Sequence, residues 1–174
     1  MSDFLPVHSG LVLLAAVLVS CTPGESRRAT HAVPSETLCR VEQVYDGDSL
    51  RVRCEGRAET VRVHCIDAPE RDQTPWGDRA HHRVRQVLGG RTVTLHPVER
   101  DSYGRLVAAV RVDGLDLGER LVRDGLAVVY TRYCPPDAPH HGAESAARSA
   151  QRGVWQTPGL HQTPWRWRHA AGTR

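Results

Sequence analysis

The stretch that decides the fold of this chain reads Val44-Tyr45-Asp46-Gly47-Asp48-Ser49-Leu50, and it is followed by Val61-Arg62-Val63-His64-Cys65-Ile66-Asp67-Ala68-Pro69-Glu70. Both segments contain the alternation of apolar and polar residues that is typical of strands with one buried face. They also hold four carboxylates and one arginine, which is more charge than a folded strand needs. We expect these charged side chains to bind a ligand, and a metal ion together with a phosphodiester would match their charges.

The dipeptide Asp46-Gly47 predicts a β-hairpin, because both central residues of a type I′ turn need positive φ. Running this hairpin outward pairs Val41 with Val52 and Cys39 with Cys54. Directly opposed strand residues lie within the Cα separation that a disulfide tolerates. We therefore expect a Cys39–Cys54 bridge, whose contribution to stability in loop-entropy models is about 3 kcal/mol.

The next strand is expected after a polar, glycine-containing loop at residues 55–59. The side-chain period of two then sets the register and places Val63 opposite Val52. Extended to the strand ends, this pairing puts Asp48 directly across from Asp67. Like charges that face each other on neighbouring strands destabilise a sheet unless something neutralises them. Because Ca²⁺ takes carboxylate and carbonyl oxygens, the sequence predicts a calcium site here.

Each of these motifs also has a purely structural interpretation. A DG turn alone means only a hairpin, and an I-D-x-P-E string alone could be a solvated loop before a helix. The register argument links the two motifs, and together they favour the functional interpretation.

Further strands are predicted at 93–98 and 106–112, joined by a turn that ends in an arginine. At this point the sequence resembles the staphylococcal-nuclease-like (thermonuclease) family over residues 38–155. The resemblance rests on four pieces in the family's order, namely the DGDSL turn from Asp46, the R-x-x-x-I-D-A-P-E stretch from Arg62 to Glu70, the D-S-Y-G-R turn from Asp101 to Arg105, and the helix-like segment from Leu115 to Ala127.

The resemblance implies an α+β fold, a five-stranded oligonucleotide-binding (OB) barrel with about three helices. Apolar spacing and glycine stop signals place helices at 79–88, 117–124 and 143–152. Adjacent histidines on a helix point to different faces, so we interpret the pairs at 81–82 and 140–141 as solvated surface rather than metal ligands.

The resemblance further implies Ca²⁺ as the cofactor. Its ligands are the carboxylates of Asp48 and Asp67 and the backbone carbonyl of Ala68, which stands where the family often has threonine. Asp46 resembles a nearby family acid that is not a direct ligand, so turn formation is its expected role.

The same resemblance implies the catalytic and substrate-binding residues. Glu70 would act as general base or orient the attacking water, while Arg62 and Arg105 would bind the phosphate. Two guanidinium groups and a cation suit the charge that builds on the phosphate oxygens during in-line attack. Tyr130 and Tyr133 would lie near the bound nucleotide. The expected reaction is hydrolysis of DNA, RNA or both to products that carry a 3′-phosphate.

The composition is compatible with this function. At 174 residues the chain allows one domain with a substantial core, expected to be a monomer. All basic residues are arginine, and the formal net charge is +3. This mild basicity permits nucleic-acid binding without establishing it, since such binding usually involves a denser basic patch.

The N-terminal segment predicts export. The apolar run at 11–19 has the length of a signal peptide, and residues 18–21 resemble the lipobox of bacterial lipoproteins. We expect a lipoprotein-type signal peptide over 1–20, lipid attachment at Cys21, and a flexible tether over 21–37. The protein would be anchored at the cell-envelope membrane, or secreted or periplasmic without the lipid. The alternative is a buried N-terminal segment with an ordinary cysteine, since residues 1–10 lack Lys and Arg.

Two features remain open. Cys65 and Cys134 could form a second disulfide, but Cys65 also suits a small core position. The tail over 156–174 is expected to pack on the domain, because two indoles left in water would be an unusual exposed patch. Its alternative role is to stack on single-stranded bases.

Two rival functions fit the same barrel. One is a nucleic-acid-binding module without catalysis, and the other is an exported interaction domain with a vestigial site. The first would be favoured by the loss of a motif residue, and the second would show no calcium-dependent thermal shift. All five are present, namely Asp48, Arg62, Asp67, Glu70 and Arg105.

Overall fold

The computed structural model describes residues 36–172. The predicted signal peptide, Cys21 and nearly all of the predicted tether lie outside these residues. Five strands form a closed barrel in the order β3-β2-β1-β5-β6. The barrel closes because β3 and β6, the first and last of these strands, also pair with each other, in parallel. The OB-type barrel is thereby confirmed. Its strands are β1 (Thr37–Val44), β2 (Ser49–Cys54), β3 (Arg57–Val63), β5 (Thr92–Arg100) and β6 (Leu106–Val112).

Three short strands lie beside the barrel. β7 (Leu115–Asp116) continues the sheet from β6. β4 (Ile66–Asp67) leaves the barrel and pairs with β8 (Val128–Val129) in a separate two-stranded sheet. This small sheet brings two segments together that lie far apart in the sequence.

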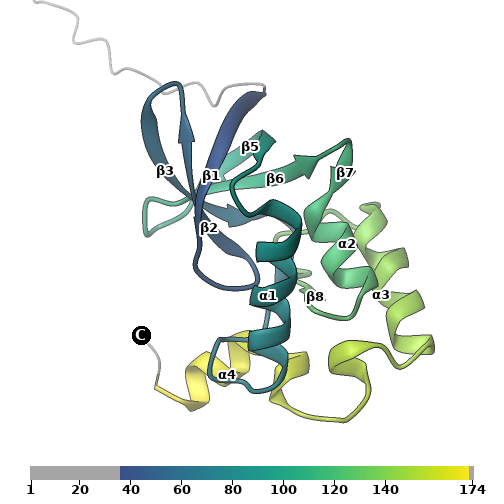
Figure 1. Ribbon diagram of the computed structural model, residues 1–174. Helices are drawn as coiled ribbons and strands as arrows, with labels where there is room; N and C mark the ends of the chain where they lie inside the picture. Colours follow the sequence, from purple (N-terminus) through teal and green to yellow (C-terminus); the bar gives the residue numbers. More distant parts are fainter. Residues whose placement is uncertain (1–35, 173–174) are drawn as a thin grey trace, which may run out of the picture. The chain divides into compact units, whose positions relative to one another are not determined.

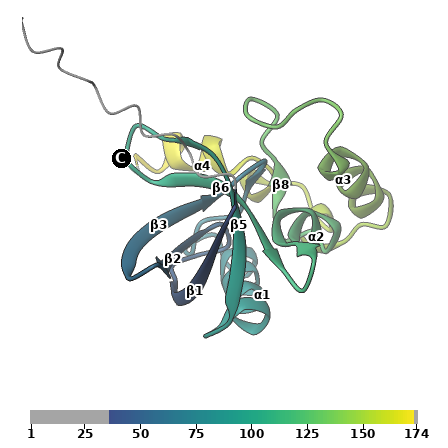
Figure 2. The same ribbon diagram turned by 90° about the horizontal axis from the view of Figure 1, so that it is seen from above.

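Four α-helices occur within the described residues, one more than predicted. They are α1 (Trp76–Leu88), α2 (Leu117–Arg123), α3 (Pro139–Ser149) and α4 (Pro164–Ala170), and two short 3₁₀ helices, η1 (Gly153–Trp155) and η2 (Leu160–Gln162), lie between α3 and α4. Figure 1 shows α1 beside the barrel and α4 near the end of α1, and Figure 2 shows α2 and α3 together on one side of the strands. Within residues 36–172, no helix combines the length and apolar character that a membrane crossing needs.

The main core fills the barrel and meets one face of α1. Full burial of each large apolar side chain stabilises the fold by about 1.5–3 kcal/mol. The buried residues include Leu50, Val52, Val61, Leu95 and Val110 from the strands and Ala80, Val84 and Leu88 from α1. α1 begins before the predicted start, and its first residue, Trp76, belongs to a second cluster with Val128 and Val154. One helix therefore links the barrel to the C-terminal part of the chain.

The first hairpin has the predicted register but a different turn. Val41 pairs with Val52, and Cys39 pairs with Cys54. The loop is wider, however, because the Tyr45 N–H donates to the Ser49 carbonyl at 2.9 Å. Neither Asp46 nor Gly47 has positive φ, so the predicted type I′ turn is wrong.

Glycine is needed at position 47 for space rather than for φ. A Cβ there would lie 2.5 Å from the Cβ of Ala68 and 2.8 Å from the Cβ of Ala80. Asp46 shapes the loop with its side chain, since its Oδ1 accepts the N–H groups of Asp48 at 2.9 Å and Ser49 at 2.6 Å. The loop thus places Asp48 close to the segment that contains Ala68.

The predicted register of β2 against β3 is wrong. A two-residue turn at Glu55-Gly56, with φ of 47° and 82°, replaces the expected five-residue loop. Val52 therefore faces Glu59 rather than Val63. The slip is an even number of residues, so the buried face of β3 is unchanged. Asp48 now lies beside Val63, whose N–H donates to the Asp48 carbonyl at 2.8 Å, and not across from Asp67.

Two disulfides join the described part of the chain. Cys39 is bonded to Cys54, and Cys65 is bonded to Cys134. The second bridge closes a far longer loop, with a sequence separation of 69 against 15. It ties the start of β4 to the segment that follows β8.

Candidate active site

Asp48 and Asp67 come together through an arginine rather than through strand register. β3 ends at Val63, and a turn through Cys65, which has φ of 69°, leads the chain into β4. Arg62, the penultimate residue of β3, places Nη1 3.0 Å from Asp48 Oδ2 and Nη2 2.7 Å from Asp67 Oδ1. One guanidinium therefore spans the two carboxylates that were predicted to share a cation.

These carboxylates lie in an environment that disfavours their charge. The side chain of Asp67 is fully buried, and burial followed by the nearby charge of Asp48 raises its pKa to about 6. Burial followed by Asp48 also raises the pKa of Asp46 to about 7. Three acids this close need more positive charge than Arg62 alone supplies.

The oxygen donors at this point suit a hard cation. The Ala68 N–H donates to Asp48 Oδ2 at 2.7 Å, so the backbone of Ala68 lies at the same edge of the site as both carboxylates. Carboxylate and carbonyl oxygens are the ligands that such cations take in proteins. Asp48, Asp67 and Ala68 therefore fit a calcium-type ion.

A second group of ligand-type residues does not form a metal centre. Cys65, Cys134 and His140 have ligand atoms within 4.8 Å of one another. The disulfide uses both thiols, which leaves only the imidazole. His140 is buried, with Nε2 3.5 Å from Asp116 Oδ1, so its predicted place on the solvated surface is wrong.

Glu70 is fixed beside Asp67 by its own backbone. Its N–H donates to Gln73 Oε1 at 2.9 Å, and its carbonyl accepts the Gln73 N–H at 2.9 Å. A Cβ at Gly77 would lie 1.8 Å from the Glu70 carbonyl oxygen, so α1 can begin against this loop only with glycine there. The carboxylate of Glu70 remains partly exposed.

Arg105 reaches the site from the other side of Asp48. Its Nε donates to Asp101 Oδ2 at 2.8 Å, and its backbone N–H donates to Asp101 Oδ1 at 2.9 Å. Burial would raise the pKa of Asp101, but these hydrogen bonds outweigh burial and hold it below its ordinary value. The Nη1 of Arg105 lies 3.5 Å from Ser49 Oγ, which itself donates to Asp48 Oδ1 at 3.1 Å.

The structure brings the five predicted residues into one cluster and adds a sixth, Arg168 of α4. Its Nη1 lies 2.6 Å from Glu70 Oε1, and its Nη2 lies 3.0 Å from Asp67 Oδ2. Hydrogen bonds to Asp67 and Glu70 raise the pKa of Arg168 in spite of its partial burial. The sequence did not predict this contact, because packing of the indoles, or base stacking by the indoles and arginines, already accounts for the P-W-R-W-R tail. The alternation of tryptophan with arginine was the signal available.

The two predicted substrate tyrosines lie directly after β8. The Tyr130 N–H donates to the Cys65 carbonyl at 2.8 Å, so Tyr130 follows the strand that pairs with β4. Its ring is 5.2 Å from that of Tyr133, which is about half exposed. The ring of Trp165 in α4 stacks on Tyr130 at 5.5 Å with an interplanar angle of 23°.

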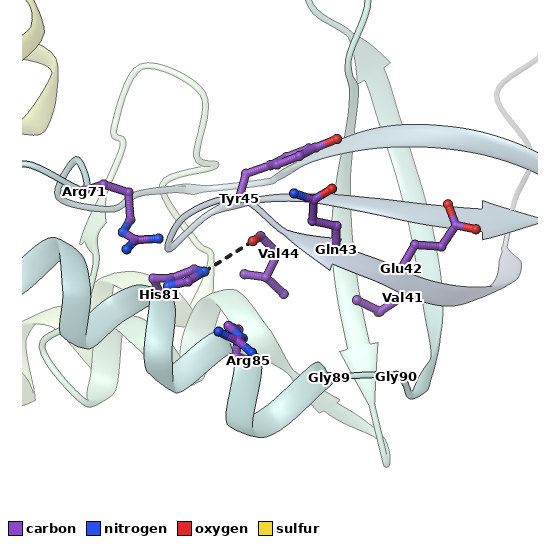
Figure 3. A pocket seen from close by; sticks show the side chains of 10 residues that line it. All are labelled: Val41, Glu42, Gln43, Val44, Tyr45, Arg71, His81, Arg85, Gly89 and Gly90. Carbon is purple, nitrogen blue, oxygen red and sulfur yellow. Dashed lines mark hydrogen bonds between the residues drawn. The ribbon is translucent and has the colours of Figure 1, made fainter.

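A basic groove of about 590 Å³ lies between the β1–β2 hairpin and α1. Figure 3 shows Arg71, His81 and Arg85 along its helix side, with Tyr45 on the hairpin. His81 Nε2 is bonded to the Val44 carbonyl at 3.3 Å, and burial followed by the charge of Arg71 lowers its pKa. The charged side chains of the groove at neutral pH are therefore Arg71, which also contacts Asp78 at 3.1 Å, Arg85, and Glu42 on β1. The end with the two arginines suits an anionic ligand.

A known protein family matches the part of the chain that contains most of this cluster. The family described as "Staphylococcal nuclease homologue" matches residues 60–157, more than half of the chain. The chain belongs to this family. Residues 62, 67, 70 and 105 of the cluster lie inside the matched range, and Asp48 lies before it.

Relatives of the chain carry nuclease names. A protein of Escherichia coli O157:H7 described as "Uncharacterized endonuclease" is 36% identical over 132 residues, which span 75% of this chain and 84% of that protein. The "Micrococcal nuclease" of Shigella flexneri is 31% identical over 141 residues, with 75% and 80% covered. The "Endonuclease YncB" of Bacillus subtilis is 31% identical over 130 residues, with 68% and 62% covered. This member of the staphylococcal nuclease family is a nuclease, a hydrolase.

Proposed function

We propose that this nuclease hydrolyses phosphodiester bonds of DNA, RNA or both with Ca²⁺ as its cation and leaves 3′-phosphate ends. The observation that carries the proposal is the contact of one guanidinium, that of Arg62, with both Asp48 and Asp67. Glu70 lies in the same cluster, because the guanidinium of Arg168 contacts both Glu70 and Asp67.

The cation would be held by the carboxylates of Asp48 and Asp67 and by the carbonyl of Ala68. When bound, Ca²⁺ supplies positive charge next to the reacting phosphate. The full burial of Asp67 near the Asp48 carboxylate supports this assignment, because two buried carboxylates need cationic partners to stay ionised.

The protein side chains then have separate roles. Arg62 and Arg105 bind the phosphate oxygens and stabilise the negative charge that builds on them. Glu70 accepts a proton from the attacking water as the water oxygen bonds to phosphorus. The bond from phosphorus to the 5′ oxygen breaks, and that oxygen keeps the electron pair and leaves as a hydroxyl once protonated. The phosphate stays on the 3′ end.

The surroundings of the site support a polymeric substrate. The groove with Arg71 and Arg85 offers a path for the phosphates of a strand beyond the cleaved bond. Tyr130 and Tyr133 provide aromatic rings near the cluster on which a base can stack.

We further propose that the protein is exported, anchored to the membrane through a lipid on Cys21, and monomeric. The two disulfides support export, since such bonds persist in oxidising compartments. Mass measurement of the N-terminal peptide from membranes and from the soluble fraction tests the lipid. An unmodified Cys21 in membrane-derived protein contradicts the anchor.

The experiment that tests the catalytic proposal uses the purified full chain. It is incubated with single- and double-stranded DNA and RNA, with millimolar Ca²⁺ or with a chelator, and the product ends are determined. We expect cleavage only with Ca²⁺ and 3′-phosphate ends. Calcium should also raise the Tm of the wild type by preferential binding to the folded state, and Asp48→Ala should remove that rise. Cleavage that survives chelation, or products with 5′-phosphates, would reject the proposal.

A further inference from the structure

Arg168 binds the two carboxylates that the proposed reaction needs free. Its Nη1 and Nη2 both lie 3.2 Å from Asp67 Oδ1, Nη2 lies 3.0 Å from Asp67 Oδ2, and Nη1 lies 2.6 Å from Glu70 Oε1. Arg62 already donates to Asp67 Oδ1 at 2.7 Å. Both oxygens of Asp67 are therefore engaged by guanidinium groups.

This arrangement leaves little room for a cation on Asp67. A carboxylate offers about four lone-pair positions, and the contacts from the two arginines use most of those on Asp67. A divalent ion on the same oxygens would also lie next to the positive charge of Arg168, and this repulsion is strong where water is excluded. The cation and Arg168 thus compete for one buried carboxylate.

The same helix also covers a predicted substrate contact. Trp165 stacks on Tyr130 and covers one face of a ring that a base would need for stacking. Trp167 Nε1 donates to Asp72 Oδ1 at 3.2 Å and holds α4 against the loop after Glu70. Three side chains of one short helix, at positions 165, 167 and 168, therefore contact the cation site, the nucleotide site and the loop between them.

We propose that α4 is an internal competitor of this nuclease, in which Arg168 competes with the cation for Asp67 and Trp165 competes with the nucleotide for Tyr130. Binding of the cation and the substrate then requires α4 to leave its place. The cation enters this inference through the proposed function, on which it rests.

The test is a calorimetric titration of the full chain with Ca²⁺, without substrate, for the wild type and three variants. Arg168→Ala should tighten Ca²⁺ binding by about 5-fold to 150-fold, the usual range for coupling between two sites. Arg168→Lys should lie between the wild type and Arg168→Ala, because an ammonium keeps the charge without the fork. Arg166→Ala is the matched control, since Arg166 is exposed on the same helix and should bind Ca²⁺ as the wild type does.

A second measurement does not depend on any substitution. Hydrogen exchange of the backbone amides in α4 is followed in the wild type with and without Ca²⁺. We expect exchange in α4 to become faster with Ca²⁺, and a dinucleotide that carries a 3′-phosphate to increase it further. The amides of β5, which contributes no residue to the cluster, should be unaffected.

Several outcomes separate this inference from the proposed function. If the wild type cleaves nucleic acid with Ca²⁺ but Arg168→Ala binds the ion no more tightly, the competitor role is rejected and the nuclease assignment stands. Weaker binding in Arg168→Ala would also reject it and make Arg168 a positioning residue. Faster exchange in α4 together with tighter binding in Arg168→Ala supports it. If no protein binds Ca²⁺, both the inference and the calcium assignment fail.

Discussion

Ser49 on β2 and Arg62 on β3 are cross-strand partners. Arg62 contacts Asp48 directly, and Arg105 approaches Asp48 through Ser49. Ser49 Oγ donates to Asp48 Oδ1 and lies 3.5 Å from Arg105 Nη1, while Arg62 Nη1 lies 3.0 Å from Asp48 Oδ2. The two oxygens of Asp48 thus have different partners. The barrel itself brings the two guanidinium groups to the same end, since β2 pairs Ser49 with Arg62 and β3 pairs with β6 directly after Arg105.

This arrangement leads to a prediction for both arginines. If Arg62 and Arg105 grip the phosphate through paired N–H groups, lysine cannot replace them, because an ammonium is a point charge without the planar fork. Arg62→Lys and Arg105→Lys should each lower kcat/KM by at least about 10²-fold, as removal of one transition-state donor does. Steady-state kinetics on a defined oligonucleotide measure this. Arg57→Lys, on the exposed part of β3, should behave as the wild type. Equal activity in all three variants would mean that the arginines supply only diffuse attraction.

Glu70 carries a separate prediction about proton transfer. Glu70→Gln keeps the shape and the hydrogen bonds of the side chain but cannot accept a proton. We expect kcat to fall by about 10² to 10⁴. The dissociation constant of a nucleotide, measured by fluorescence, should stay near the wild-type value. A variant with near-normal kcat would show that Glu70 has a structural role only.

The third prediction concerns the stability of the helical side of the fold. Asp116 caps α2 by accepting the Glu119 N–H at 3.0 Å, and it lies 3.5 Å from His140 Nε2. Burial would raise its pKa, but the hydrogen bond from His140 and the one from the Glu119 N–H outweigh burial and lower it. A carboxyl whose pKa is lower in the folded state stabilises the protein above its unfolded pKa. That contribution is lost as the pH falls through the folded pKa.

Asn is as good a helix cap as Asp, so Asp116→Asn removes the charge and keeps the cap. At pH 7 the variant should be less stable by about 0.5–1 kcal/mol, the size of a charge effect at a helix N-terminus. Urea unfolding from pH 3 to pH 7 measures the difference, which should shrink below about pH 4 as Asp116 protonates. A difference that stays constant over this range would contradict the charge interaction.

Much of the barrel could be predicted from the sequence because its information is local. β6 has the predicted bounds, and α1 ends at the predicted glycines, since alternation and helix stop signals act within a few residues. The register of β3 could not be predicted in this way. It depends on Glu55 taking a left-handed conformation that the sequence does not favour for glutamate.

The candidate site shows the same difference between what nearby residues predict and what depends on distant ones. Asp48, Arg62, Asp67 and Glu70 come from one short stretch, and the structure brings them together even though the register argument for Asp48 and Asp67 is wrong. Arg168 could not be found in this way, because about a hundred residues separate it from Asp67 and Glu70. Only the packing of Trp165 and Trp167 brings it there.

The last prediction concerns the groove between the hairpin and α1. If a strand runs along it, Arg85 neutralises a phosphate that lies away from the cleaved bond. Arg85→Ala should then raise the KM for a long oligonucleotide and leave the KM for a dinucleotide unchanged. Loss of one phosphate contact should also reduce the slope of log KM against log salt concentration by about 1. The control is Arg57→Ala, on an exposed part of β3 outside the groove. An equal effect of Arg85→Ala on both substrates, or the same salt slope as the wild type, would remove the groove from the path of the strand.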